Sequence, residues 1–341
     1  MGPKYNFTDD IIEYNGHILH RIIRLSDNKL GGWIESEINL SQEGKCWVDD
    51  EAKVYGSAKV KDNAIIVGKA EVCGWAIVAD AALIGNEAFV SDNAQVFGRA
   101  TCSDRVHITG ESRVYGNAKI CNYAKVTGDA HVYDNAVIKG AATVLGNTQI
   151  KDNAVISENA KIYGNAVVAN NATITGNAEV FDNAFIFDNA LVDTSFNAAQ
   201  TKIHGEAQIY GKAKVEAGDI YDQAQIYDEA NVYATNGDSP DPKIFGNARI
   251  SGKARISSGT EIYGNAQVYG SAHIGFRAQI SGNACIYGNA TVKGGVKVFG
   301  DAQVCEQAWL DGRQKVYGNA VVTEMYTRAT SGHKIFTGDE R

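Results

Sequence analysis

Apolar residues recur along this chain at a fixed interval of six. From Val48 to Leu191 the sequence divides into 24 consecutive hexads without a slip. The first position of each hexad is Val or Ile, except at Cys102, and the fifth position is Ala in all but three hexads. A typical hexad is VYGNAK at 114–119. Repetition at a fixed interval indicates a solenoid, in which one small structural unit is stacked many times.

The order of residues within a hexad predicts a short strand followed by a corner. An amphipathic helix would place apolar residues three and four apart, and a period of six does not. The β-branched first residue suits a strand; it points inward, so its two neighbours point outward. Gly or Asp at the third position and Asn at the fourth favour a turn, because these residues tolerate left-handed backbone angles. Ala at the fifth position is small enough to point into a tight corner.

Three such units would form a triangular coil in which equivalent residues stack roughly 4.8 Å apart. We therefore expect Asn147, Asn165 and Asn183 to share one corner, where turn formation and a ladder of side-chain amides account for their recurrence. Gln314 occupies a fifth position where Ala is expected. This residue predicts either a buried polar group with a partner or a distorted coil.

The repeat continues beyond residue 191 with three interruptions. Residues 192–202 occupy 11 places where two hexads would need 12, and residues 215–219 (VEAGD) are one residue short. Residues 236–243 (NGDSPDPK) hold two of the three prolines and predict a protruding loop. A second unbroken tract of 13 hexads then runs from Ile244 to Val321. We predict an all-β fold: a single-stranded parallel β-helix of about 14 coils with capped ends, forming one rod.

The two ends of the chain depart from the repeat, as expected if they cover the open strand edges of a solenoid. Residues 1–47 are interpreted as an N-terminal cap that contains a β-hairpin, because Asn15 and Gly16 favour a type I′ turn between strand-like segments. Residues 48–322 form the β-helix, and residues 323–341 are expected to cover its last coil.

Composition narrows the classes of partner. The formal net charge is −8, and no basic patch suggests nucleic-acid binding. No apolar segment has the length of a membrane-spanning helix, and no signal peptide is recognised at the N-terminus. The six cysteines are isolated and include no CxxC pair. We expect a cytoplasmic protein with reduced thiols and no membrane partner.

The seven histidines supply one candidate general base. His107, His131 and His273 occupy outward sixth positions, and the first two are separated by four hexads, which places them on different faces. His204 is the best catalytic candidate, because it follows the interruption at 192–202, where a loop could shape a pocket. The alternative is a solvated surface histidine. No pair within residues 107–273 has the close spacing of a zinc site, so we predict no metal.

Aromatic residues recur at outward second positions and predict stacked columns. Phe97, Tyr115 and Tyr133 follow one another at intervals of three hexads. A further column is expected in the second tract, formed by Phe245, Tyr263, Ser281, Phe299 and Tyr317. Tyr227 extends it if the proline loop keeps the phase of the repeat. Such columns either stabilise neighbouring strands or form a contact surface on a flat face.

The hexads over 48–321 resemble the bacterial transferase hexapeptide-repeat superfamily, which implies a left-handed, three-sided β-helix. A second resemblance lies in Gly31-Gly32-Trp33-Ile34, Asn39–Gly44 and Cys46-Trp47-Val48, which look like the YdcK-type family of bacteria and phages. Its members are commonly labelled acetyltransferases. The superfamily resemblance implies a trimer that binds acyl-CoA between neighbouring helices, with a histidine as general base. Fold alone does not establish that activity.

Two functions therefore remain open. The first is a non-catalytic rod that serves as a binding or assembly scaffold, through an aromatic flat face or the interrupting loops. Its partner would be another protein or further copies of itself, as a homo-oligomer such as a trimer, and it would need no cofactor. The alternative is an acyl-CoA-dependent acyltransferase that uses acetyl-CoA, with His204 as its base. The weakness of the histidine candidates favours the scaffold.

Overall fold

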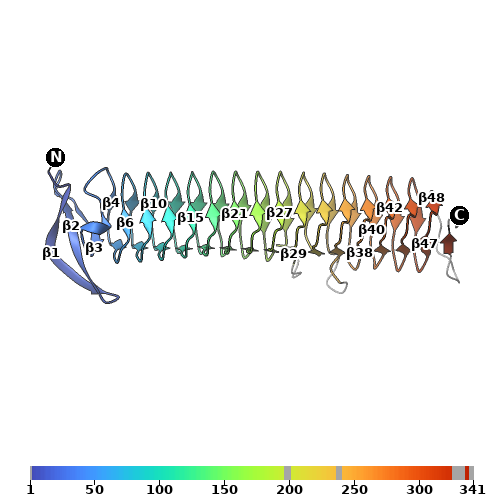
Figure 1. The fold of residues 1–341 in the computed structure, drawn as a ribbon, viewed down its shortest axis with the longest axis horizontal. Helices are drawn as coiled ribbons and strands as arrows, with labels where there is room; N and C mark the ends of the chain where they lie inside the picture. Colours follow the sequence, from blue (N-terminus) through green and yellow to red (C-terminus); the bar gives the residue numbers. More distant parts are fainter. Residues whose placement is uncertain (1, 196–200, 236–239, 325–334, 338–341) are drawn as a thin grey trace. The chain divides into compact units, whose positions relative to one another are not determined.

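The computed structural model describes residues 2–195, 201–235, 240–324 and 335–337. It is all-β: a β-solenoid of about 16 turns with three parallel sheets and a single short 3-10 helix, η1 (Glu37–Asn39), among the described residues. The predicted all-β parallel β-helix is confirmed, and its left-handedness stays a prediction. The chain divides into two compact units, residues 1–164 and 165–341, whose coils are drawn in Figure 1.

The hexad 114–119 shows why this sequence forms a coil. Val114 and Ala118 are fully buried, so that the large and the small apolar residue of the hexad both point into the core. Gly116 adopts a φ of 70°, which turns the chain at the corner. Asn117 keeps a negative φ. In this hexad the turn therefore takes its left-handed residue from the third position alone.

In the first unit, three strands make each coil, and we name the sheets A, B and C. Sheet A contains β5 (Lys53–Val54), β8 (Glu71–Val72), β11 (Phe89–Val90), β14 (His107–Ile108), β17 (Lys125–Val126), β20 (Thr143–Val144) and β23 (Lys161–Ile162). Sheet B contains β6 (Lys59–Val60), β9 (Ile77–Val78), β12 (Gln95–Val96), β15 (Arg113–Val114), β18 (His131–Val132) and β21 (Gln149–Ile150). Sheet C contains β4 (Trp47–Val48), β7 (Ile65–Ile66), β10 (Leu83–Ile84), β13 (Thr101–Cys102), β16 (Lys119–Ile120), β19 (Val137–Ile138) and β22 (Val155–Ile156).

An antiparallel hairpin precedes these coils. Strands β1 (Tyr5–Tyr14) and β2 (His17–Arg24) pair across Asn15 and Gly16, whose φ angles of 50° and 80° confirm the predicted turn. Strand β3 (Leu30–Ile34) pairs antiparallel with β2 and parallel with β5, so it links the hairpin to the solenoid.

Two glycines allow β3 to lie this close to the first coils. A Cβ atom on Gly31 would stand 2.6 Å from the Trp47 ring and 2.7 Å from Ile22. A Cβ on Gly32 would stand 2.6 Å from the carbonyl oxygen of Ala52. All three distances are shorter than a non-bonded contact permits, which explains the Gly-Gly pair of the N-terminal segment in physical terms.

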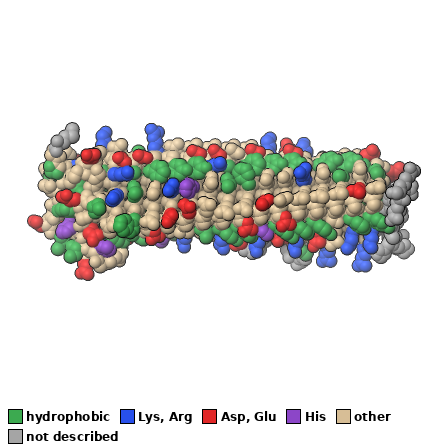
Figure 2. Space-filling model, viewed as in Figure 1, with side chains coloured by type: hydrophobic (Ala, Val, Ile, Leu, Met, Phe, Trp, Pro, Cys, Tyr) green, Lys and Arg blue, Asp and Glu red, His purple; other side chains and the backbone are tan. Residues whose placement is uncertain are grey.

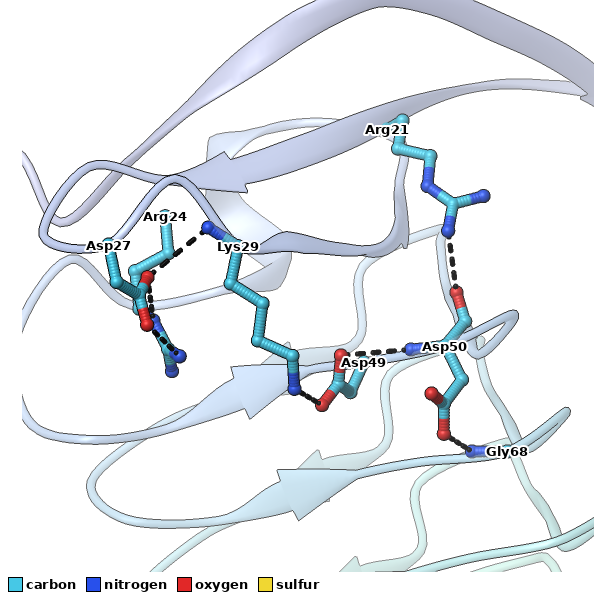
Figure 3. A network of polar contacts seen from close by, with 7 residues as sticks. All are labelled: Arg21, Arg24, Asp27, Lys29, Asp49, Asp50 and Gly68. Atoms are coloured by element: carbon cyan, nitrogen blue, oxygen red, sulfur yellow. Dashed lines mark hydrogen bonds and ion pairs between the residues drawn. The ribbon is translucent and has the colours of Figure 1, made fainter.

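Polar contacts further attach the hairpin to the first coils (Figure 3). Lys29 forms an ion pair with Asp49, and Arg21 donates a hydrogen bond of 3.3 Å to the carbonyl oxygen of Asp50. The carboxylate of Asp50 in turn accepts a hydrogen bond from the Gly68 backbone. These contacts lie at the surface, where Lys29 and Asp50 are exposed and Arg21 and Asp49 are partly exposed, so each contributes at most about 1 kcal/mol.

The second unit repeats the three-sheet arrangement. Sheet A contains β26 (Glu179–Val180), β29 (Lys202–Ile203), β32 (Asp219–Ile220), β35 (Lys243–Ile244), β38 (Glu261–Ile262), β41 (Gln279–Ile280), β44 (Lys297–Val298), β47 (Lys315–Tyr317) and β49 (Ile335–Thr337). Sheet B contains β24 (Val167–Val168), β27 (Phe185–Ile186), β30 (Gln208–Ile209), β33 (Gln225–Ile226), β36 (Arg249–Ile250), β39 (Gln267–Val268), β42 (Cys285–Ile286), β45 (Gln303–Val304) and β48 (Val321–Val322). Sheet C contains β25 (Thr173–Thr175), β28 (Leu191–Asp193), β31 (Lys214–Val215), β34 (Asn231–Val232), β37 (Arg255–Ile256), β40 (His273–Ile274), β43 (Thr291–Val292) and β46 (Trp309–Leu310).

The interruptions change the length of a coil without breaking the ladders. Glu179 pairs with Lys202, Lys202 with Asp219, and Asp219 with Lys243. The first and third of these steps are longer than a regular coil of three hexads, and the second is one residue shorter. The interpretation of 192–202 as two hexads lacking one residue is therefore wrong. This segment is one hexad with five additional residues, because β28 is followed directly by β29 of the same coil.

Parts of these segments lie outside the described residues: 196–200 in the first interruption, 236–239 in the proline loop, and most of the predicted C-terminal cap.

The predicted asparagine ladder is present at the corners. The Asn165 amide donates to the Asn183 side-chain oxygen at 3.1 Å, and Asn117 and Asn135 repeat this geometry one above the other. Gln314 is 2% exposed, and neither of its amide atoms has a hydrogen-bond partner within the described part of the chain. The coil at Gln314 therefore retains its shape around an unsatisfied polar group.

Candidate functional site

The predicted column of the first unit is present on sheet B. Phe97, Tyr115 and Tyr133 follow β12, β15 and β18, and their ring centroids are 4.9 Å apart with interplanar angles of 1°. All three rings are partly exposed. Their faces cover one another, so the column presents ring edges and hydroxyl groups to the surroundings. Burial raises the pKa of Tyr115 and of Tyr133, which keeps both phenols protonated over the physiological range.

A longer column follows sheet A in the second unit. Its members, in stacking order, are Phe181, His204, Tyr221, Phe245 and Tyr263. Ser281 then replaces a ring, and Phe299 and Tyr317 form a separate stacked pair 5.1 Å apart. The predicted stacking of Phe245 on Tyr263 is confirmed.

Tyr227 does not belong to that column, and its placement there is wrong. It stacks on Tyr210 at 4.9 Å, and Tyr210 stacks on Phe187 at 4.8 Å, in a column on sheet B. The proline loop lengthens its coil by six residues, so Tyr221 lies under Phe245 instead.

Figure 2 shows hydrophobic side chains gathered in stripes on the surface, with polar side chains between them.

His204 is a member of the sheet A column. Its imidazole lies between the rings of Phe181, at 4.6 Å, and Tyr221, at 5.2 Å. Its Nε2 atom is 3.0 Å from Asp219 Oδ1, and its Nδ1 atom is 3.8 Å from Asp182 Oδ2. Both ring faces are covered and Nε2 is hydrogen-bonded to Asp219, which fixes the imidazole within the column. The geometry therefore favours a structural role for His204 over that of a general base.

A surface hollow beside His204 does not include its ring. It measures about 510 Å³ and is lined by corner residues, among them Asp182, Gly205 and Glu206. The amide, carboxylate and backbone groups that line it suit solvent more than an acyl chain.

Within the described residues, no group of three or more His, Cys, Asp or Glu side chains is arranged to hold a metal ion. All six cysteines are free thiols. None of the described helices is long and apolar enough to cross a membrane.

Sequence reasoning missed the rings that complete the columns on either side of the interruptions: Phe181, Phe187, Tyr210 and Tyr221. A search at the regular spacing of three hexads cannot find Phe187, Tyr210 or Tyr221, because their ring neighbours lie across a lengthened or shortened coil. Phe181 follows Tyr163 by three hexads and could have been found in this way. Alignment of the hexads by their second position, without a fixed spacing, would have grouped them.

A comparison with known protein families finds a similar repeat. Residues 278–294 match a family model described as the YdcK Beta solenoid repeat. The matched segment contains the buried residues Ile280, Ile286 and Val292, one from each sheet. The match covers a single coil, so it supports similarity of the repeat. No curated protein matches the chain.

Proposed function

We propose that this protein is a non-catalytic β-solenoid that acts as an assembly scaffold, and that its aromatic columns form the contact surface. The observation that carries the proposal is the geometry of the columns. Coplanar, partly exposed rings recur every 4.9 Å on the flat faces of both units. Aromatic side chains are favoured at the cores of protein interfaces.

The periodicity of the columns indicates what kind of partner fits them. A partner that packs along several coils must offer groups at the same interval of about 4.8 Å, the spacing between neighbouring strands. A second copy of this chain carries a surface with that interval. Self-association into a homo-oligomer, such as a trimer, is therefore the favoured use, and a different protein partner is the second.

Neighbouring side chains on sheet B are compatible with a contact face. Arg113 is exposed beside the column of the first unit, and His131 lies edge-on to Tyr115 with a centroid distance of 6.3 Å. Arginine and tyrosine are among the residues that contribute most to binding energy at interfaces.

The acyltransferase alternative would require acetyl-CoA binding and an available histidine base. The stacked and doubly paired position of His204 gives this alternative no support. Acetyl-CoA binding remains its decisive requirement and can be measured by calorimetry.

The proposal is tested by sedimentation velocity on the full chain and on two variants. In the double variant Tyr115→Ser and Tyr133→Ser, which removes most of one column, self-association should weaken at least about tenfold, because interface aromatics contribute about 2 kcal/mol or more each. Tyr123→Ser is the matched control: Tyr123 is 58% exposed and stands outside the columns. Equal association of all three proteins, or micromolar binding of acetyl-CoA, would overturn the proposal.

A further inference from the structure

One corner of the second unit carries every interruption of the repeat. The additional residues after β28, the shortened segment after β31 and the proline loop after β34 all lie between a strand of sheet C and the next strand of sheet A. They occur in three successive coils. Insertions in a solenoid often lie on its binding side, which makes this corner and the adjoining face of sheet C the place to expect a ligand site.

The same corner is strained two coils further on. Phe276 has a φ of 53° and Arg277 a φ of 67°. Every other non-glycine residue with a positive φ in the described ranges is Asn, Asp or Glu. A bulky residue in this region is a conformational outlier, and Phe276 is also 51% exposed. Strain of this kind is retained where a site requires it.

Sheet C beside this corner places several side chains that can donate hydrogen bonds close together. Arg255 and His273 pair as neighbours on β37 and β40, and both point outward. The hydroxyl of Tyr233 lies 3.4 Å from Nε2 of His273, so the tyrosine extends across the intervening coil. Gly275 lets Ser257 approach the backbone beside these groups: a Cβ at residue 275 would stand 2.3 Å from Ser257 Oγ and 3.9 Å from His273 Nε2.

The charges around His273 are positive. Its half-buried position, and then the nearby charges of Lys293 and Arg255, lower the pKa of this imidazole. Neither cation forms an ion pair with any carboxylate in the described part of the chain. Asp311, which follows Lys293 in the next coil, accepts a hydrogen bond from the Gly312 backbone at 2.7 Å. In a chain of net charge −8, these two cations give the surroundings of His273 a local positive charge that would attract an anion.

Aromatic rings border this positive site. The Nζ atom of Lys293 lies 5.2 Å from the centre of the Trp309 ring and 5.9 Å from that of Phe276. Trp309 is 40% exposed. The two rings hold the ammonium group in place and leave exposed apolar surface beside it.

We propose that Tyr233, Arg255, His273 and Lys293 bind a phosphate group, either as the free ion or as the phosphoryl group of a small organic molecule. A phosphate oxygen accepts strong hydrogen bonds from guanidinium, ammonium and imidazolium groups. The Tyr233 hydroxyl supplies a further donor, and Phe276 and Trp309 offer contacts to the apolar part of an organic phosphate.

Calorimetric titration of the full chain with inorganic phosphate and with phenyl phosphate tests the site. We expect one binding site per chain and an affinity that falls roughly tenfold in Lys293→Gln and in Arg255→Gln, since each removes a charged hydrogen-bond donor. Lys297→Gln is the matched control, because this exposed lysine lies one strand further along, on sheet A. Tighter binding of phenyl phosphate assigns an organic phosphate, and equal binding assigns the free ion.

Nuclear magnetic resonance of His273 supplies an independent readout. A bound phosphate favours the imidazolium, so the pKa of His273 should rise when phosphate is added. Absence of heat and of any His273 shift at millimolar phosphate and phenyl phosphate would overturn the proposal. Equal weakening by Lys297→Gln would do the same, because it would indicate diffuse attraction without a site.

Discussion

Replacement of Gln314 by methionine should stabilise the C-terminal coils. The side chain is 2% exposed, and both of its amide atoms lack a hydrogen-bond partner in the described part of the chain. A buried amide without partners costs about 1–3 kcal/mol in protein mutational data. Methionine keeps nearly the same length and volume, so Gln314→Met removes this cost without opening a cavity. The expected gain is about 1–3 kcal/mol.

Hydrogen exchange is the suitable assay, because the stability of a solenoid is distributed over its repeats. The Lys297 amide donates to the Gln314 carbonyl oxygen at 2.9 Å, and the Phe299 amide donates to Val316 at 3.0 Å. Protection of these two amides should rise about 5-fold to 150-fold, since about 1.4 kcal/mol corresponds to a factor of ten. Gln267→Met, at an exposed position of β39, is the control and should change protection little.

Unchanged or reduced protection in Gln314→Met would refute this reasoning, because it would mean that the amide is satisfied in solution. Gln314→Glu provides a second check: it buries a charge at the same place and should reduce protection of the same amides.

Three further predictions concern the N-terminal cap and the sequence-derived candidate base. Gly31→Ala should destabilise the cap by about 1–3 kcal/mol in thermal unfolding followed by tryptophan fluorescence, whereas Gly85→Ala, whose added methyl would meet its nearest atom at 3.4 Å, should be tolerated. Hydrogen bonds from a histidine and a tryptophan, respectively, lower the pKa of Glu35 and of Glu51 from 4.5. Their contribution is therefore complete above pH 4.5 and lost as the pH falls through the lowered values. Protection factors of the amides in β2 and β3, corrected for the intrinsic exchange rate at each pH, should therefore fall in acid while those of the middle coils stay unchanged. A uniform fall would contradict this. His204→Phe should preserve the free energy of unfolding to within about 0.5 kcal/mol. His204→Ala should lower it by roughly 0.5–1.5 kcal/mol, because the ring stacking is lost. A larger loss in His204→Phe than in His204→Ala would argue against a role of His204 in the column.

The regular tracts of this fold could be predicted because each hexad repeats the same local physics. The buried first and fifth positions, the amide ladder through Asn165 and the stack at Tyr115 all follow from a coil of three hexads. The phase beyond an interruption could not be predicted in this way. Counting residues does not reveal whether 192–202 gains five residues or loses one, because only the strand pairing fixes the register. Tyr227 was misplaced for that reason.

The proposed phosphate site could not be predicted from the sequence, for a related reason. Tyr233 and His273 are far apart in the sequence and meet because a long side chain extends across a neighbouring coil. Neither residue stands out in its own hexad. The significance of Phe276 also lies in its backbone angle, which its identity alone does not reveal.

The mass of the protein in solution tests the proposed function most directly. Light scattering over a range of concentrations should give a multiple of the 36.6 kDa chain mass, and the Tyr115→Ser, Tyr133→Ser double variant should shift towards a single chain. A constant mass of 36.6 kDa for the unmodified protein at every concentration would contradict assembly through the aromatic columns.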